Sequence, residues 1–483
     1  MAITTGKRIL KNSLSVIAGN FLNKALSIAI LLSLTSYLSP ASFGRYTFVI
    51  AYTAFFGIFT DLGLNTFLTK EISSGSIKPS TGFGHAIVLR FLVTAATTAI
   101  LLLSLLLMGY PADILWLAAA SSIALFLSFR GLFFRTVFNI PFQVHLKMGY
   151  PAVINFLNEL LTLVVVLWLI ARSATLFSII LGMALVNLPG FVVLAFYSTR
   201  LVRPKIEFDI EAWWRILKGS LPLGAAIFME GVFIIIPVFV LSLFSSDEAI
   251  GFFGLPFRLV SSLWIIPVAV MMSLLPRMSL DAVTTKASVS QGFSKGLKLM
   301  LLAGLPAVLV TDYFSLPIIT VLAGDGYSAA APVLSIMIWG TFMYFINTVF
   351  FYTFTAAGRQ GLNTVVWSII SLASVLICVI LIPPYGVTGA AVGFVAPLAI
   401  GVLVNLLLAR RVFTMNVVPV LSRFLLSGLL ALIIVTVLPF NRLASLPVGL
   451  GVYVVTLLYQ GTISLREWNE WLGPEKVESK KTF

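Results

Sequence analysis

Long apolar runs separated by short polar turns occur along the whole chain. Each run has at least about 18 residues, which is enough for a helix to cross the roughly 30 Å hydrocarbon layer of a bilayer. The short alternating strands typical of a membrane barrel are not seen in the sequence. We therefore predict an all-α polytopic membrane protein with about fourteen transmembrane helices, at residues 14–38, 43–69, 83–108, 112–138, 147–171, 174–199, 213–244, 249–276, 293–322, 327–356, 361–382, 386–409, 421–439 and 445–463.

The composition agrees with this prediction. The chain has 483 residues, of which 59% are hydrophobic and only 10% charged, and its mean hydropathy is +1.07. A soluble protein of this length has too little interior to bury so much apolar surface. The basic N-terminal residues resemble the start of a signal peptide, but the apolar run that follows is long and contains Lys24, which predicts a retained first helix.

Several kinds of chemistry are disfavoured by the residue types present. The single Cys378 precludes an internal disulfide, and the two histidines, His85 and His145, have no cysteine near them in the sequence. No G-x-x-x-x-G-K phosphate loop occurs, so the chain is not expected to be an ATPase. We predict no metal site and no cofactor.

The basic residues predict the orientation in the membrane. The net charge is +14, and most of the 31 lysines and arginines fall in alternate loops. Because short cytoplasmic loops of membrane proteins are enriched in lysine and arginine, this bias predicts that both termini are cytoplasmic and that the number of helices is even. The positive charge is thus read as a topology signal rather than as a nucleic-acid-binding surface.

An internal repeat organises the helices. "LKNSLSVIAGNF" begins at Leu10 and "LKGSLPLGAAIF" at Leu217, a shift of 217 − 10 = 207 residues that also pairs Gly44 with Gly251. Six predicted helices separate the copies, so both start on the same membrane side, as expected for a parallel duplication. We predict an N-terminal lobe of helices 1–6 (1–206), a C-terminal lobe of helices 7–12 (207–411), and helices 13–14 with a cytoplasmic tail (412–483).

Two segments resemble a known family. "ASFGRYTF…FTDLGLNTFLTKEIS" at 41–73 and the turn "PPYGVTGAA" within 358–394 resemble bacterial flippases for O-antigen and exopolysaccharide, which belong to the multidrug/oligosaccharidyl-lipid/polysaccharide (MOP) exporter superfamily. The N-terminal copy lacks the matching Tyr-Gly-x-x-Gly-Ala-Ala turn, so the repeat has diverged there.

The resemblance implies a fold and an activity. It implies two six-helix, MATE-like bundles around a central cavity in the bacterial inner membrane. The implied activity is not enzymatic. It is the movement of undecaprenyl-pyrophosphate-linked oligosaccharides to the outer leaflet by alternating access, with membrane lipids, a proton or sodium counter-ion and polysaccharide polymerase machinery as partners. Helices 13–14 would form a groove for the lipid tail, or simply pack against lipid.

Charged residues at membrane depth are the candidate site. The basic ones are Lys24, Arg90, Arg130 and Arg258. Intramembrane charges normally face a bundle interior or a wet cavity. Polar residues lie on the same helix face as Lys24, which favours such a cavity. Since lysine and arginine can replace water around phosphate oxygens, these four are the predicted substrate-binding residues.

Acidic residues at similar depth leave alternatives open. Asp61, Glu159 and Glu230 could be counter-ions or sites for a coupling proton or sodium ion. The alternative to a role in substrate or ion binding is that these charges form structural ion pairs: Lys24 with Asp61, Arg130 with Glu159 and Arg258 with Glu230. An alternative function is a cation-coupled multidrug exporter of the same superfamily, for which the excess of basic residues is unfavourable. The sequence does not exclude a scaffold or a scramblase.

Overall fold

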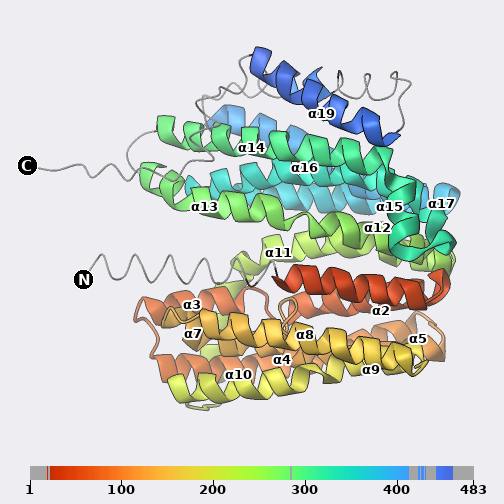
Figure 1. Cartoon of the computed structure of the whole chain (residues 1–483). Coiled ribbons are helices and arrows are strands. Elements are labelled where there is room, and N and C mark those ends of the chain that lie inside the picture. The colour runs from red at the N-terminus through yellow and green to blue at the C-terminus, as the bar shows by residue number, and fades with distance from the viewer. Residues whose placement is uncertain are drawn as a thin grey trace, which may run out of the picture. The chain divides into compact units, whose positions relative to one another are not determined.

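The computed structural model describes residue 19 and residues 22–282, 286–412, 422–424, 426–428, 430 and 442–460 (Figure 1). Within these ranges the regular structure is helical and no strand occurs. Nine of the described helices are long and apolar enough to cross a membrane, and shorter apolar helices accompany them. The prediction of an all-α polytopic protein is confirmed. Most of the predicted helix 421–439 lies outside the described residues.

The helix bounds follow the predicted ones closely in most of the chain. The first described helix is Leu22–Tyr37. The others, labelled in Figure 1 where there is room, are α2 (Pro40–Phe59), α3 (Leu64–Ser73), α4 (Pro79–Leu107), α5 (Ala112–Ser122), α6 (Ala124–Leu127), η1 (Phe134–Asn139), α7 (Ile140–Val144), α8 (Gly149–Ala171), α9 (Leu176–Leu185), α10 (Asn187–Leu201), α11 (Ile210–Phe244), α12 (Asp247–Ser262), α13 (Ile265–Ala282), α14 (Lys286–Tyr313), α15 (Ser315–Ala323), η2 (Asp325–Ala330), α16 (Ala331–Ala356), α17 (Gln360–Val412) and α19 (Arg442–Tyr459). The segment labelled α17 consists of two helices that meet at a kink at Gly386, between the predicted helices 361–382 and 386–409.

Several predicted spans are divided into shorter helices: 174–199 into α9 and α10, 249–276 into α12 and α13, and 293–322 into α14 and α15. Two further spans are interrupted near the residues of the candidate site, and the prediction of continuous helices was wrong there. The predicted span 43–69 divides into α2 and α3 around Leu62 and Gly63, whose φ angles are 42° and 83°. The predicted span 112–138 runs through α5 and α6, unwinds over residues 128–133 and resumes in η1. Apolar periodicity does not reveal such breaks, because unwound backbone inside a membrane protein is stable wherever other groups bond to it.

The chain forms two compact units, each described here by itself. The first contains residues 1–265, 315–340 and 361–401, and the second contains 266–314, 341–360 and 402–483. Inside the second unit, Asn405 donates a 2.8 Å hydrogen bond from Nδ2 to Oδ1 of Asn347, and the Tyr453 hydroxyl donates to the Leu301 carbonyl at 2.9 Å. The predicted lobe boundaries at residues 206 and 411 stay predictions.

In the first unit, α2 and α12 begin in the same way. Their N-caps, Ser39 and Ser246, are related by the predicted shift (246 − 39 = 207). Each serine Oγ accepts a 3.3 Å hydrogen bond from the backbone N–H three residues further on, which satisfies one of the free donors at a helix start. The repeat seen in the sequence is therefore also a repeat of local structure.

The same two helices pack through glycines that the repeat also pairs. A Cβ atom on Gly44 would overlap the carbonyl of Asp247, and one on Gly251 would overlap the carbonyl of Pro40. Asp247 and Pro40 are themselves repeat partners (247 − 40 = 207). The contact is thus two-fold symmetric in its residues, and its closeness requires glycine at both positions.

Alanine at this contact is expected to destabilise the fold. In Gly44→Ala and Gly251→Ala the new methyl group meets backbone, which cannot move aside as a flexible side chain would, so a cost of about 1–3 kcal/mol is expected. The melting temperature of the detergent-solubilised protein should fall in both variants. Gly361→Ala is the matched control, since a Cβ there meets no atom within 4 Å. Melting temperatures equal to that of the control would show that α2 and α12 are not in this close contact.

Candidate functional site

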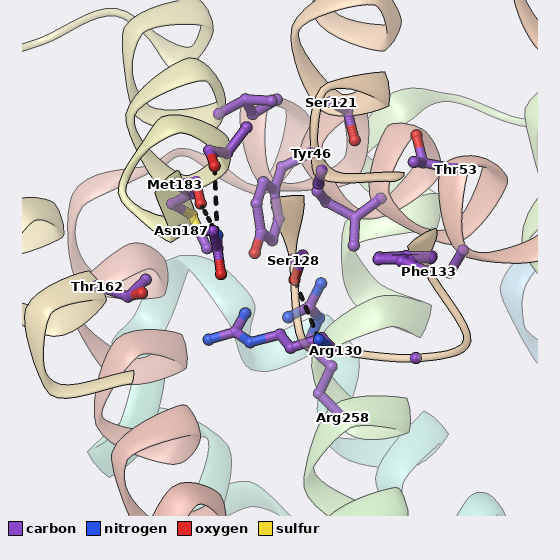
Figure 2. A pocket seen from close by; sticks show the side chains of 16 residues that line it. Tyr46, Thr53, Ser121, Ser128, Arg130, Phe133, Thr162, Met183, Asn187 and Arg258 are labelled. Atoms are coloured by element: carbon purple, nitrogen blue, oxygen red, sulfur yellow. Dashed lines mark hydrogen bonds between the residues drawn. The ribbon is translucent and has the colours of Figure 1, made fainter. Parts of the chain in front are cut away.

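A pocket of about 800 Å³ lies in the first unit (Figure 2). It is lined by residues of α2, α5, α6, the unwound segment that follows α6, α8, α9, α10 and α12. We call it the cationic pocket. The charged residues that line it are Arg130 and Arg258, and none of its lining residues is an aspartate or glutamate. Its other polar lining residues are Tyr46, Thr53, Ser121, Ser128, Thr162 and Asn187.

Arg258 reaches the pocket from α12. Its guanidinium carbon lies 4.9 Å from the centre of the Tyr46 ring, a cation–π contact that holds the flat group without using its N–H donors. The guanidinium makes no hydrogen bond or ion pair with the described residues, and the predicted pair with Glu230 is not formed. Its donors therefore remain free for a ligand in the pocket.

Arg130 lies on the unwound segment between α6 and η1. Its guanidinium makes a two-pronged ion pair with the buried Glu159 of α8, with distances of 3.1 Å from Nε to Oε2 and 2.5 Å from Nη2 to Oε1. This predicted pair is confirmed. The pairing uses one edge of the planar group and fixes its orientation, while the side chain stays partly exposed in the pocket.

Lys24 adds a third positive charge. It lies on the first described helix, is half-buried, and is within electrostatic range of Arg258, Arg130 and Glu159. It forms no ion pair with the described part of the chain, and the predicted pair with Asp61 is wrong, because Asp61 pairs with Arg90. Lys24 is not a lining residue of the cationic pocket. Of Lys24, Arg130 and Arg258, only Arg130 is bonded to Glu159, so the described residues of this region carry an excess of positive charge.

Arg90 has a different environment from the other basic residues. Its side chain is fully buried on α4, and Nη1 lies 3.2 Å from Oδ1 of Asp61. Its other hydrogen bonds go to the carbonyls of Thr60, Leu132 and Phe133 and to the Thr136 hydroxyl, at 2.6–3.2 Å. These acceptors lie at the breaks in both interrupted helices. Arg90 therefore donates hydrogen bonds to backbone carbonyls that have lost their helical partners at the breaks.

Asp61 completes this arrangement. Its carboxylate accepts hydrogen bonds from the backbone N–H groups of Gly63 and Asn65, at 3.3 and 3.2 Å, and so caps the start of α3. Neither Asp61 nor Arg90 lines the cationic pocket. These contacts support a structural role for both, and the substrate-binding role of Arg90 and the ion-coupling role of Asp61 stay predictions.

A buried arginine was missed by the sequence reasoning. Arg135 in η1 is fully buried and donates to the side-chain oxygens of Asn158 and Asn155 at 3.1 and 3.2 Å. Asn158 in turn donates to Asn187, a lining residue of the pocket. Arg135 is near the end of a predicted helix, where a long cation normally reaches the interface. The available signal was Asn155 and Asn158, three residues apart on one helix face.

A second cavity of about 1050 Å³ adjoins the cationic pocket. It is lined mainly by apolar residues of α2, α11 and α12, and its charged lining residues are Glu230 and Arg258. We call it the apolar chamber. The two cavities share Arg258 and Gly131 among their lining residues. Glu230 makes no hydrogen bond or ion pair with the residues that the structure describes.

Comparison with known proteins places the chain in a family. Residues 9–280, more than half of the chain, match the family model described as "Polysaccharide biosynthesis protein". The chain belongs to this family. It is 21% identical over 424 residues to the "Putative O-antigen transporter" of Shigella flexneri, an alignment that covers 84% of this chain and 98% of that relative. The resemblance inferred from the sequence is thereby confirmed.

Solved structures show the same fold. The lipid II flippase MurJ, in its inward closed conformation, has a TM-score of 0.75 and 17% identity, and covers 92% of this chain and 98% of its own. An inward-facing multidrug resistance MATE transporter of the MOP superfamily has a TM-score of 0.64 and 14% identity, and covers 80% of this chain and 94% of its own. This member of the polysaccharide biosynthesis family therefore has the fold of MurJ and of MATE transporters. The relatives named here are transporters and flippases rather than enzymes.

Removing the charge of Asp61 is expected to harm folding first. Asp61→Asn keeps the shape but leaves Arg90 as a buried charge without a counter-ion, a change that costs about 3–5 kcal/mol in buried pairs. Size-exclusion chromatography and thermal melting of the solubilised variant should show less folded protein and a lower melting temperature. Glu211→Gln, which removes an exposed 3.4 Å pair with Arg215, is the control and should melt as wild type does. Normal melting with lost transport would instead place Asp61 in the transport step.

Proposed function

We propose that the protein is a flippase that moves undecaprenyl-pyrophosphate-linked oligosaccharide units across the bacterial inner membrane for the assembly of O-antigen, capsule or exopolysaccharide. The observation that carries this proposal is the positive charge of the cationic pocket, which is lined by Arg130 and Arg258 and by no acidic residue. Arg130 is paired with Glu159, Arg258 has no carboxylate partner among the described residues, and Lys24 lies within electrostatic range of both arginines. Membership of the polysaccharide biosynthesis family and the likeness to an O-antigen transporter support it.

The chemistry of the pocket fits a diphosphate. A diphosphate loses its hydration when it enters a low-dielectric region, and charged hydrogen-bond donors must then replace the lost water. Arg258 offers its free donors, while the pairing with Glu159 holds Arg130 in one orientation. The isoprenoid tail can stay in the hydrocarbon layer while the headgroup passes through the pocket.

Alternating access would require α2 and α12 to separate where Gly44 meets Asp247. At that end Arg45 bridges Asp247 and Asp113, with distances of 2.7 Å from Nε and 2.9 Å from Nη1. Partly exposed ion pairs of this kind contribute less than about 1 kcal/mol, so they can hold one state without blocking the other. We propose that Arg45 acts as a reversible latch at this end.

Glu230 is the candidate for a coupling ion. Glu159 and Asp61 are already paired with arginines, whereas Glu230 faces the apolar chamber without a partner among the described residues. We propose that it takes up a proton or a sodium ion. A membrane potential that is positive outside would also favour outward movement of an anion, by about 2.3 kcal/mol per charge per 100 mV. In this proposal both termini are cytoplasmic, and the polymerase machinery receives the product.

A cationic-drug exporter is the less favoured function. A pocket for cations is expected to offer carboxylates and aromatic faces, as quaternary ammonium sites do. The cationic pocket has aromatic residues but none of its lining residues is acidic, and Glu230 faces the other cavity.

Loss of the unpaired cations should abolish transport without unfolding the protein. Lys24→Ala and Arg258→Ala each remove a positive charge that interacts with the diphosphate, so transport should fall by at least about tenfold. The measurement is surface polysaccharide in a strain that depends on this gene, with the amount of protein in the membrane checked in parallel. Arg172→Ala, at an exposed arginine stacked on Trp168, is the control. Normal polysaccharide in both pocket variants would refute the proposed role of these cations.

Neutralising Glu230 should change the response to an ion gradient. Glu230→Gln keeps the size of the side chain but can neither release a proton nor attract a sodium ion. Flipping by proteoliposomes that contain the variant should no longer respond to a pH or sodium gradient, while the wild type does. An unchanged response in Glu230→Gln would exclude this residue as the coupling site.

A further inference from the structure

Two hydroxyl groups in the wall of the cationic pocket have no hydrogen-bond partner. They belong to Thr53 of α2 and Ser121 of α5, which are 3% and 2% exposed, and neither bonds to any described residue. Both residues line the pocket. A buried hydroxyl that lacks a partner costs free energy and is uncommon in native structures, so each one requires an explanation.

Their position separates them from the guanidinium groups. Figure 2 shows Thr53 and Ser121 toward one end of the pocket, with the ring of Phe133 at a level between Thr53 and the guanidinium groups. The guanidinium groups of Arg130 and Arg258 lie toward the other end, and Tyr46 lies between the two groups. The pocket thus has a neutral end, with hydroxyls and an aromatic ring, next to a cationic end.

The chemistry of the neutral end selects among the parts of a lipid-linked substrate. A phosphate would bind at the arginines, which offer charged donors. An isoprenoid tail would leave both hydroxyls unsatisfied. A sugar ring presents hydroxyls, which can both donate and accept, together with apolar C–H faces that can lie against an aromatic ring.

We propose that this end of the pocket, which we call the hydroxyl subsite, binds the sugar joined directly to the diphosphate and contributes to selection of the substrate. The inference rests on the proposed function. With the diphosphate at Arg130 and Arg258, the sugar bonded directly to it is the part of the oligosaccharide that would lie nearest to Thr53 and Ser121 in the same pocket. Ordered water is the competing occupant, and it would satisfy the same hydroxyls without distinguishing one sugar from another.

The test compares lipids that differ only in the first sugar. Purified full-length protein in detergent is titrated with undecaprenyl diphosphate alone, and with undecaprenyl diphosphate that carries a single N-acetylglucosamine, N-acetylgalactosamine, galactose or glucose. The measured quantity is the ratio of the Kd of the bare lipid to the Kd of each sugar-bearing lipid. Both Kd values are measured on the same preparation of each variant, so a fraction of unfolded protein does not change their ratio.

The variants are chosen to remove one hydroxyl each. Thr53→Val removes the hydroxyl but keeps the shape of the side chain, and Ser121→Ala removes Oγ. Thr53→Ser keeps the hydroxyl and removes only the methyl group. Thr199→Val is the control, since its hydroxyl bonds to the Ala195 carbonyl of its own helix and lies outside the pocket. The wild type should prefer at least one sugar-bearing lipid, and Thr53→Val and Ser121→Ala should each lower that ratio about fivefold, as expected for one neutral hydrogen bond. Thr53→Ser and Thr199→Val should keep it.

The outcomes separate this inference from the proposed function. A wild type without any sugar preference, or a preference that survives in the Thr53→Val, Ser121→Ala double variant, would overturn the hydroxyl subsite and favour water there. If the bare lipid diphosphate binds and Arg258→Ala abolishes its binding, the proposed function survives that result. If the bare lipid diphosphate does not bind at all, both the proposed function and the subsite fail.

Discussion

The positive charge held near the cationic pocket is the constraint on which the rest of the structure depends. A charged side chain at bilayer depth is costly unless it is paired, hydrated or bound to a ligand. The protein pairs Arg130 with Glu159 but places Lys24 and Arg258 nearby without a carboxylate partner in the described residues. Such a cluster is stable in a wet cavity and becomes more stable when an anion enters it. The pocket and its broken helix provide that cavity.

The arginines of the first unit illustrate how environment decides the role of one residue type. Arg90 is fully buried and all its described contacts go to Asp61 and to backbone or hydroxyl oxygens at the helix breaks. Arg258 is held by an aromatic face and keeps its donors free. The first arginine bonds to carbonyls of the unwound segment, and that segment carries Arg130, which lines the same pocket as Arg258. The structural ion pair and the proposed binding site are therefore parts of one arrangement.

Much of this architecture could be predicted from sequence, because helix position and repetition are local properties. The shift of 207 residues aligns Ser39 with Ser246 and Gly44 with Gly251, and the structure then shows that the serines are N-caps and that the glycines form a close contact. The pair of Arg130 and Glu159 was also predicted correctly. Side-chain pairing across broken helices was not predictable in the same way. The break after α2 turns Asp61 toward Arg90 and the start of α3, whereas the pairing with Lys24 assumed a continuous helix.

The central claim is that an anionic headgroup binds where these cations gather, and a structure with ligand tests it most directly. The measurement is a cryo-electron microscopy map of the full-length protein in nanodiscs with undecaprenyl diphosphate. The account predicts density for the diphosphate within hydrogen-bonding distance of Arg130 and Arg258, with Lys24 nearby. A map in which Lys24 and Arg258 point into acyl chains, or in which the lipid phosphates bind elsewhere, would contradict it.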